Sequence, residues 1–420
     1  MSRLSASSLL DQPEQPSVAS APSHHATTQY IQRGTPQFIR VTLALFSAGL
    51  ATFALLYCVQ PILPLLSQEF AVSPATSSLS LSVSTALLAF GLLITGPLSD
   101  AIGRKSVMVT ALMLAALCTL ISATMTSWHG ILLMRALTGL ALSGVAAVGM
   151  TYLSEEIHPG FIAFSMGLYI SGNSIGGMSG RLISGVIADF FSWRAAIATI
   201  GCFALASALM FWKILPPSRH FRPTSLRPKN LLINFRLHWR DPGLPLLFAE
   251  GFLLMGAFVT LFNYIGYRLV SPPWSLNQAI VGLLSVVYLT GTWSSPKAGA
   301  MTAVFGRGRV MLFSTGVMLA GLLLTLFSSL WLILGGMMLF SAGFFAAHSV
   351  ASGWIGPRAK RAKGQASSLY LFSYYLGSSL AGTAGGLFWH RFGWPGITLF
   401  ISTLLIIALY IGKQLKNRAV

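Results

Sequence analysis

Residues 96–104 read Gly-Pro-Leu-Ser-Asp-Ala-Ile-Gly-Arg, and residues 299–307 read Gly-Ala-Met-Thr-Ala-Val-Phe-Gly-Arg. Each stretch places a glycine, six further residues and a Gly-Arg pair between two long apolar runs. Further matches keep the same order and nearly the same interval: Trp128 with Trp331, Gly176 with Gly377, Gly185 with Gly386, and Trp193 with Trp394. Chance similarity between apolar segments explains single matches but not this register. The sequence therefore predicts two related halves.

The composition places these halves in a membrane. Of the 420 residues, 54% are apolar and only 9% are charged, whereas a soluble domain carries roughly 25% charged residues. The 41 glycines fit the same class, because glycine is more frequent in membrane helices than in soluble ones. The net charge of +18 lies in short clusters between apolar runs. It forms no aromatic-studded basic face, so no nucleic-acid partner is expected.

Twelve segments are long and apolar enough to span a bilayer, for which about 20 residues are needed. This pattern predicts an all-α integral membrane protein with these spans: 39–65, 76–97, 106–126, 129–152, 161–187, 195–215, 244–268, 278–298, 308–328, 331–355, 365–388 and 395–412.

Lys and Arg residues between the spans set the orientation. They gather on the side of the chain ends, and only Arg194, Arg268 and Arg391 lie opposite, so both termini are predicted to be cytoplasmic. Residues 231–239 are predicted to be either an amphipathic helix on the headgroups or plain solvated chain. The predicted domains are a disordered cytoplasmic tail (1–37), a six-helix bundle (38–215), a cytoplasmic central linker (216–243), a second six-helix bundle (244–413) and a tail (414–420).

Two parallel halves of six helices are typical of transporters, whose solute site lies near the bilayer midplane between the halves. The sequence has no G-x-x-x-x-G-K-[ST] loop for ATP, and no cluster of metal or cofactor ligands is expected. The interpretation is a secondary transporter, not an enzyme, driven by an ion gradient. Its expected partners are membrane lipids and a small-molecule substrate, and we expect a monomer.

Three stretches carry a family resemblance. Gly96–Lys105 resembles the signature loop G-x-L-x-D-x-x-G-R-K between the second and third helices of the major facilitator superfamily. Arg135–Gly139 resembles the fourth-helix motif R-x-x-Q-G, and Gly172–Gly177 resembles the fifth-helix antiporter motif G-P-x-I-G-G, with Asn173 in place of its proline. The resemblance is to the drug-efflux-like branch. It implies the major facilitator fold and transport across a bacterial inner membrane.

The resemblance implies a conformational role for the signature loop and for the fifth helix. Gly103 permits a tight turn, and Arg104 and Lys105 anchor that end at the anionic leaflet. Asp100 is implied to meet the start of the eleventh helix and to tie the halves together, although a plain topology anchor is the alternative. The helix-five glycines indicate close packing or a flexible seam between the halves. The predicted gating set is Gly96, Asp100, Gly103, Arg104, Lys105, Gly172, Gly176 and Gly177.

Ionisable residues inside spans are costly and are functional candidates by default. Glu250 is the only acid well inside a span, and it and His348 are the candidates for carrying a coupling proton. The alternatives are that Glu250 reaches the cytoplasmic interface and that His348 is a packed core histidine. Arg135 is a coupling or binding candidate through its motif. Arg181 is either functional, paired with Asp189, or directed to the outer interface.

Polar and aromatic side chains that could line a central cavity complete the candidates: Tyr57, Asn173, Asn263, Tyr264 and Tyr374. The spans of the first half contain two arginines and no deeply placed carboxylate, which favours neutral or anionic solutes. We predict proton-coupled efflux of a small organic molecule by alternating access. The alternatives are a sugar or organic-anion exporter, importer or exchanger that is not proton-driven, and a non-transporting membrane sensor or scaffold.

Overall fold

The computed structural model describes residues 30–221 and 228–418. Most of the predicted N-terminal tail, part of the predicted central linker and the last two residues of the predicted C-terminal tail lie outside these described residues. The described part of the chain is helical, apart from one isolated β-bridge between Ile31 and Ile157.

The helices before the linker are α1 (Pro36–Tyr57), α2 (Leu63–Glu69), α3 (Pro74–Ile102), α4 (Arg104–Ser122), α5 (Trp128–Glu156), η1 (Pro159–Phe161), α6 (Ile162–Phe190) and α7 (Trp193–Ile214). The linker contains α8 (Pro228–Arg240). The helices after it are α9 (Leu244–Val270), α10 (Gln278–Leu283), η2 (Leu284–Tyr288), α11 (Leu289–Phe305), α12 (Arg307–Leu324), α13 (Leu330–Arg358) and α14 (Lys363–Asn417).

Several helices begin where a polar side chain can accept the first free backbone N–H. Thr35, Ser73, Ser127, Ser192 and Asn277 each occupy an N-cap and accept a hydrogen bond from the residue three positions on. These caps satisfy donors that have no partner within the helix, and they mark where the apolar runs turn into helix.

Ten helical segments within the described ranges are long and apolar enough to cross a membrane, with α10, η2 and α11 counted together. Two further observations raise this number to the predicted twelve. The helix α6 spans 29 residues, as α5 does. The 55-residue α14 is two helices merged at Gly393, whose φ of 60° and ψ of −143° break the helical path.

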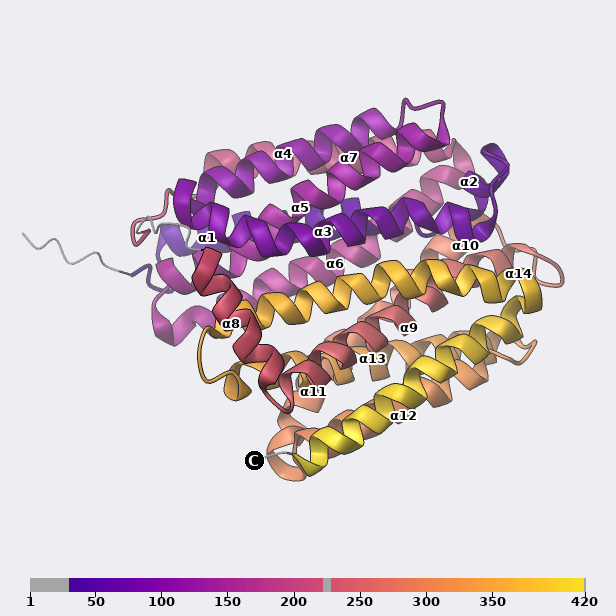
Figure 1. The fold of residues 1–420 in the computed structure, drawn as a ribbon. Coiled ribbons are helices and arrows are strands. Elements are labelled where there is room, and N and C mark those ends of the chain that lie inside the picture. Colours follow the sequence, from indigo (N-terminus) through magenta and orange to yellow (C-terminus); the bar gives the residue numbers. More distant parts are fainter. Residues whose placement is uncertain (1–29, 222–227, 419–420) are drawn as a thin grey trace, which may run out of the picture.

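The helices form one bundle made of two groups (Figure 1). The group α1–α7, drawn in indigo to magenta, lies beside the group α9–α14, drawn in red to yellow, and the described part of the chain starts and finishes at the same end of the bundle. The opposite end carries α2 and α10. Many large apolar side chains face outward, such as Phe191 at 80% and Trp331 at 83% exposed. Such a surface suits contact with lipid.

The two groups repeat the same helix contacts. A β-carbon on Gly176 of α6 would clash with the carbonyl of Leu50 in α1, and one on Gly377 of α14 would clash with the carbonyl of Phe252 in α9. These pairs occupy equivalent positions in the sequence repeat. Residues that match between the two halves of the sequence therefore make the same helix–helix contacts. Small residues allow this close backbone approach.

The first predicted span, 39–65, is wrong as a single helix. The helix α1 ends at Tyr57, the chain turns around Pro61, and α2 starts at Leu63. The reason is that a proline lacks the N–H that would continue the helix and clashes with the preceding turn. The apolar character continues across this break, so hydropathy alone does not show it.

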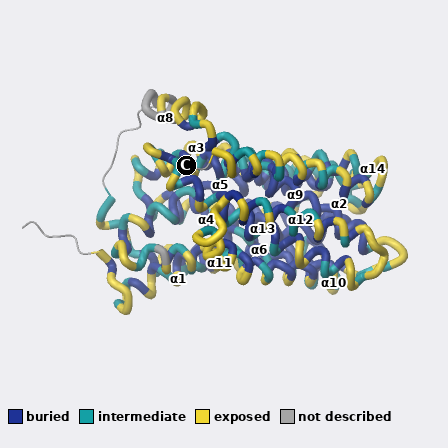
Figure 2. Tube along the Cα trace, turned by 90° about the horizontal axis from the view of Figure 1, so that it is seen from below, coloured by how far each residue is buried: buried dark blue, intermediate teal, exposed yellow. Residues whose placement is uncertain are grey.

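The chain ends and the linker also differ from the predicted boundaries. Ile31, placed in the predicted disordered tail, is 6% exposed and exchanges backbone hydrogen bonds with the end of α5. At the other end, α14 continues to Asn417, inside the predicted tail. In the linker, Pro228–Arg240 form the helix α8, which lies outside the bundle (Figure 2), and its contact with the headgroups stays a prediction.

Candidate functional site

The signature loop joins α3 to α4 at the end of the bundle where the described part of the chain starts and finishes (Figure 1). Gly103 has a φ of 106°, which disfavours any residue with a β-carbon. Asp100 forms an ion pair with Arg104. The Arg104 guanidinium also donates to both carboxylate oxygens of Glu155 in α5, at 2.7 and 3.1 Å. Lys105 Nζ donates to the carbonyl of Leu215 at 2.5 Å.

These contacts hold the signature loop against α5 and the end of α7, all within the first group of helices. The prediction that Asp100 meets the start of the eleventh helix concerns another conformation and stays a prediction. Gly96 has open space where a β-carbon would lie, so packing does not explain it.

The helix-five glycines pack against α1, so the predicted seam between the halves is wrong for them. A β-carbon on Gly172 would clash with the carbonyl of Phe46, and Gly176 has the same relation to Leu50. Asn173 lies against Gly49, also in α1, and Gly177 faces Arg181. One of the seams that join the two groups lies further along α6, where a β-carbon on Gly185 would come within 2.7 Å of the Gly282 Cα.

Arg135 is fully buried at 1% exposed, and backbone carbonyls surround its guanidinium. It donates to the carbonyls of Leu55 at 2.8 Å, Leu56 at 2.6 Å and Ser80 at 2.9 Å. Leu55 and Leu56 belong to the last turn of α1, whose carbonyls have no partner within the helix because α1 stops at Tyr57. A positive charge is also favoured at a helix C-terminus. Arg135 therefore holds the broken end of α1 in place.

Arg181 lies where the two groups of helices meet. It is 4% exposed, its Nε donates to Gln60 Oε1 at 2.6 Å, and its Nη1 donates to the carbonyl of Gly177 at 2.5 Å. The Gln60 amide in turn donates to Asn263 Oδ1 of α9 at 2.7 Å. Arg181 neither pairs with Asp189, which accepts from the backbone N–H of Gln278, nor extends to the outer interface. It starts a polar chain that crosses from α6 to α9.

Aromatic rings enclose the Arg181 guanidinium. Its carbon lies 4.3 Å from the ring centre of Tyr57, 4.5 Å from that of Tyr288 and 6.0 Å from that of Phe262. Tyr374, 8% exposed, lies on α14 close enough to interact with the Arg181 charge. These distances are typical of cation–π contacts. The structure thus brings the predicted residues Tyr57, Arg181, Asn263 and Tyr374 to one place.

Glu250 lies apart from this cage, inside the second group of helices. Its side chain is fully buried, and both carboxyl oxygens lack a hydrogen-bond partner among the described residues. A β-carbon on Gly412 would lie 3.4 Å from Glu250 Oε1, so the carboxyl group faces the last helix rather than the interface. The alternative in which the Glu250 side chain reaches the cytoplasmic surface of the membrane is therefore wrong.

Tyr370 lies between the neighbourhood of Glu250 and His348. Its ring lies over Gly251, next to Glu250, and close enough to interact with the charge of Glu250. Its hydroxyl is 2.8 Å from His348 Nδ1. The His348 ring in turn lies 4.6 Å from the ring of Tyr374, at the edge of the aromatic cage. Tyr370 thus contacts His348 and lies beside Glu250, to which it makes no hydrogen bond in the described chain.

Hydrogen bonds between the two groups gather toward the end that carries α2 and α10. The Tyr267 hydroxyl is 2.7 Å from Ser67 Oγ and donates to the carbonyl of Leu63 at 2.9 Å. Thr383 Oγ1 is 2.7 Å from Ser82 Oγ. Tyr264, predicted for the cavity, donates instead to the carbonyl of Gly382 within its own group at 3.0 Å. These bonds close that end of the bundle.

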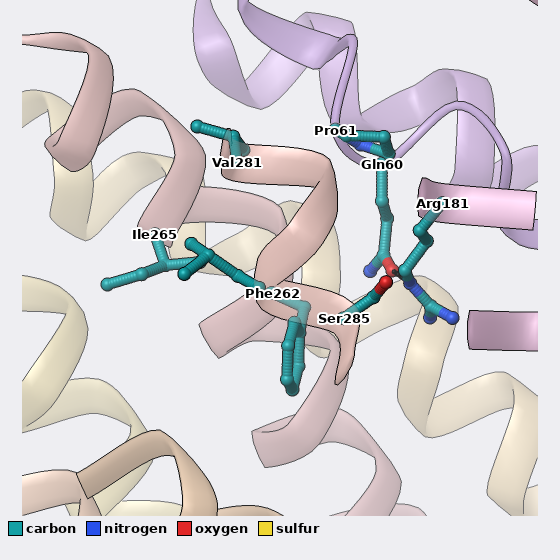
Figure 3. Close-up of a pocket in the computed structure, with 8 residues that line it drawn as sticks. Gln60, Pro61, Arg181, Phe262, Ile265, Val281 and Ser285 are labelled. Atoms are coloured by element: carbon teal, nitrogen blue, oxygen red, sulfur yellow. Dashed lines mark hydrogen bonds between the residues drawn. The ribbon is translucent and has the colours of Figure 1, made fainter. Parts of the chain in front are cut away.

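A small cavity lies beside the polar chain (Figure 3). Figure 3 shows the side chains of Gln60 and Arg181 meeting at their polar ends, with Ser285 next to them and Phe262 beyond. The cavity has about 20 Å³ of room for water-sized molecules, which suits a water but not an organic solute. In residues 30–221 and 228–418, no three His, Cys, Asp or Glu side chains gather as metal ligands would.

The comparisons with known proteins agree with this architecture. The sequence profile of the Major Facilitator Superfamily matches residues 43–280. "Inner membrane transport protein YnfM" of Escherichia coli (strain K12) is 81% identical over 390 residues, which cover 93% of this chain and 94% of that protein. The chain belongs to the Major Facilitator Superfamily.

Further relatives of this superfamily member are transporters rather than enzymes. An uncharacterized transporter of Buchnera aphidicola subsp. Baizongia pistaciae is 53% identical over 93% of this chain and 97% of its own length. A bacterial homologue of the human lysosomal transporter Spinster, in an inward-facing and occupied conformation, has a TM-score of 0.74 over 91% of this chain and 97% of that one, with 14% identity. The chain is a multi-pass inner-membrane transporter with the major facilitator fold.

Sequence reasoning missed several residues of the site. Tyr288 and Tyr370 lie in apolar runs and belong to no motif. The signal for Gln60 was the Gln-Pro pair in an otherwise apolar segment, because a polar side chain next to a helix-breaking proline marks irregular backbone at membrane depth.

Proposed function

We propose that this transporter exports a small organic solute and that the export is coupled to protons. The observation that carries the proposal is the fully buried Glu250, whose carboxyl oxygens have no partner in the described chain. Keeping a negative charge there is costly. A carboxyl group that must gain a proton when it is enclosed, and can lose it when access changes, is what proton coupling requires.

The position of Tyr370, over Gly251 and in contact with His348, supports a route for the proton. Its hydroxyl contacts His348 Nδ1 at 2.8 Å, and the His348 ring borders the aromatic cage at Tyr374. Tyrosine and histidine can each donate and accept a proton. Outward transport is supported by the resemblance of Gly172–Gly177 to the antiporter motif. The proposal needs no cofactor and no ATP, and it holds for a monomer surrounded by lipid.

The test compares Glu250→Gln with wild type in proteoliposomes. The solute is first identified by a survey of toxicity and uptake in cells with and without the protein. In the variant, an imposed proton gradient should no longer drive that solute, whereas exchange of labelled against unlabelled solute should continue. The matched control is Glu69→Gln, since Glu69 is a half-exposed carboxylate 3.6 Å from Arg194 at the opposite end. Wild-type pH dependence in Glu250→Gln would show that another group carries the proton.

A further inference from the structure

Arg181 carries a positive charge that no carboxylate balances. Its hydrogen bonds go to the neutral Gln60 side chain and the carbonyl of Gly177, and the salt bridges found in the described ranges join other residues. An arginine cannot shed its proton in a protein. A buried charge without a counter-charge is destabilising. The site is therefore electrostatically incomplete until an anion joins it.

Unused hydrogen-bond donors surround this charge. The Nη2 of Arg181 makes no hydrogen bond within the part of the chain that the structure describes. The buried hydroxyls of Tyr57 and Tyr288 also lack partners there. Buried polar groups are normally paired. Three donors without acceptors, on Arg181 and on the two tyrosines whose rings contact it, fit an oxygen anion better than a neutral group.

The surroundings also define the rest of the ligand. Tyr57 and Tyr288 present ring faces on the guanidinium at 4.3 and 4.5 Å, and the ring of Phe262 lies at 6.0 Å. Arg181 offers one positive charge and one guanidinium nitrogen without a hydrogen bond, so a ligand with a single negative charge would balance it. The aromatic surroundings favour an aromatic body next to the charged end of the solute.

We propose that the transported solute is an organic monoanion whose carboxylate binds Arg181 beside Tyr57 and Tyr288, with an aromatic body next to their rings. The solute binds when the two groups of helices part, because the cavity beside Arg181 has room only for a water in the present conformation. This inference rests on the proposed function, because it names the solute class of the same transporter. Arg181 and Tyr57 belong to the first group of helices, and Tyr288 and Asn263 belong to the second. The anion therefore contacts both moving parts, as a solute bound between two rocking halves must.

The test measures binding to the full-length protein, purified in detergent, by ligand-dependent thermal unfolding. The probes are benzoate, 4-hydroxybenzoate and 1-naphthoate, each compared with its neutral amide, and chloride serves as an inorganic anion. At least one carboxylate should raise the unfolding temperature, and its amide should bind about 10- to 100-fold more weakly, which is the usual contribution of a hydrogen bond to a charged group.

The variants locate the effect. Arg181→Gln should weaken carboxylate binding by about the same 10- to 100-fold and leave amide binding unchanged. Arg181→Lys should keep a preference for the carboxylate over the amide, because the charge remains. The matched control is Arg194→Gln. Arg194 is a partly exposed arginine at the start of α7, where it pairs with Glu69 at the end of α2. This variant should bind the carboxylates as wild type does. If Arg181→Gln fails to fold, Tyr288→Phe provides the second test, with an expected several-fold loss.

Three results would overturn the inference. They are equal binding of carboxylate and amide, stabilisation by chloride alone, and no stabilisation by any carboxylate. The outcome is separate from proton coupling because this assay uses no proton gradient. If the protein binds a carboxylate but a proton gradient drives no transport, the anion site would stand and the proposed proton coupling would be refuted. If protons drive transport of a neutral solute and Arg181→Gln does not change that transport, the proton coupling would stand and the anion site would be refuted.

Discussion

Replacing Arg135 with methionine should destabilise the protein rather than specifically uncouple it. The substitution keeps an apolar stem but removes three hydrogen bonds, to the carbonyls of Leu55, Leu56 and Ser80. Hydrogen bonds in membrane proteins average about 0.6 kcal/mol, and those of charged groups reach about 1.5 kcal/mol or more. Three such bonds bracket the loss in free energy of unfolding between about 2 and 5 kcal/mol.

The assay is equilibrium unfolding of the purified protein in mixed detergent micelles, followed by tryptophan fluorescence. Arg135→Lys should fall between wild type and Arg135→Met, because an ammonium cannot reach all three carbonyls at once. Arg194→Gln is the control, since surface ion pairs contribute about 1 kcal/mol at most. The reasoning fails if Arg135→Met unfolds like wild type yet loses gradient-driven transport. Arg135 would then have the coupling role that its motif implied.

Four further substitutions test other parts of the structure. Gly377→Ala should destabilise by about 1–3 kcal/mol, because its β-carbon would clash with a backbone carbonyl, whereas Gly316→Ala, where that atom has open space, should change unfolding little. Tyr267→Phe removes two contacts across the α2 end, so a cysteine placed there should react faster with an impermeant maleimide. Burial raises the pKa of Asp241, but hydrogen bonds from a neighbouring guanidinium and two backbone amides outweigh it and hold that pKa below its ordinary value. Its stabilisation is therefore present at neutral pH and lost below about pH 4, and unfolding of wild type and Asp241→Asn should converge there. Asp100→Asn should slow transport while membrane insertion, measured by immunoblotting of membranes, stays normal. Unchanged transport in that variant would remove the proposed contact with the eleventh helix.

Much of the fold was predictable because lipid leaves the backbone few choices. A segment in hydrocarbon must satisfy every backbone group internally, so each long apolar run becomes a helix. The predicted segment 195–215 corresponds to Trp193–Ile214, and 244–268 corresponds to Leu244–Val270. The internal repeat added information that hydropathy lacks, since it placed Gly176 and Gly377 at equivalent positions before any packing was known.

The site was less predictable because it depends on which way side chains point. Arg135 and Arg181 are both arginines in the middle of apolar spans, yet one binds backbone carbonyls at the end of α1 and the other lies in an aromatic cage. Neighbouring positions on a helix face different directions. Hydropathy does not show which direction a given side chain faces. The break before α2 had a local signal in Pro61, but the carbonyls that it frees became evident only in three dimensions.

Hydrogen bonds concentrated toward one end of the bundle have an energetic consequence. A carrier must visit two shapes whose free energies differ by only a few kcal/mol, or one of them would be too rare to serve turnover. Hydrogen bonds at this end join Ser67 to Tyr267 and Ser82 to Thr383. When the molecule changes to its other conformation, interactions of similar free energy must form at the opposite end of the bundle. Strengthening these bonds would trap the carrier, and weakening them would leave the other shape dominant, so their modest number and strength keep both shapes populated.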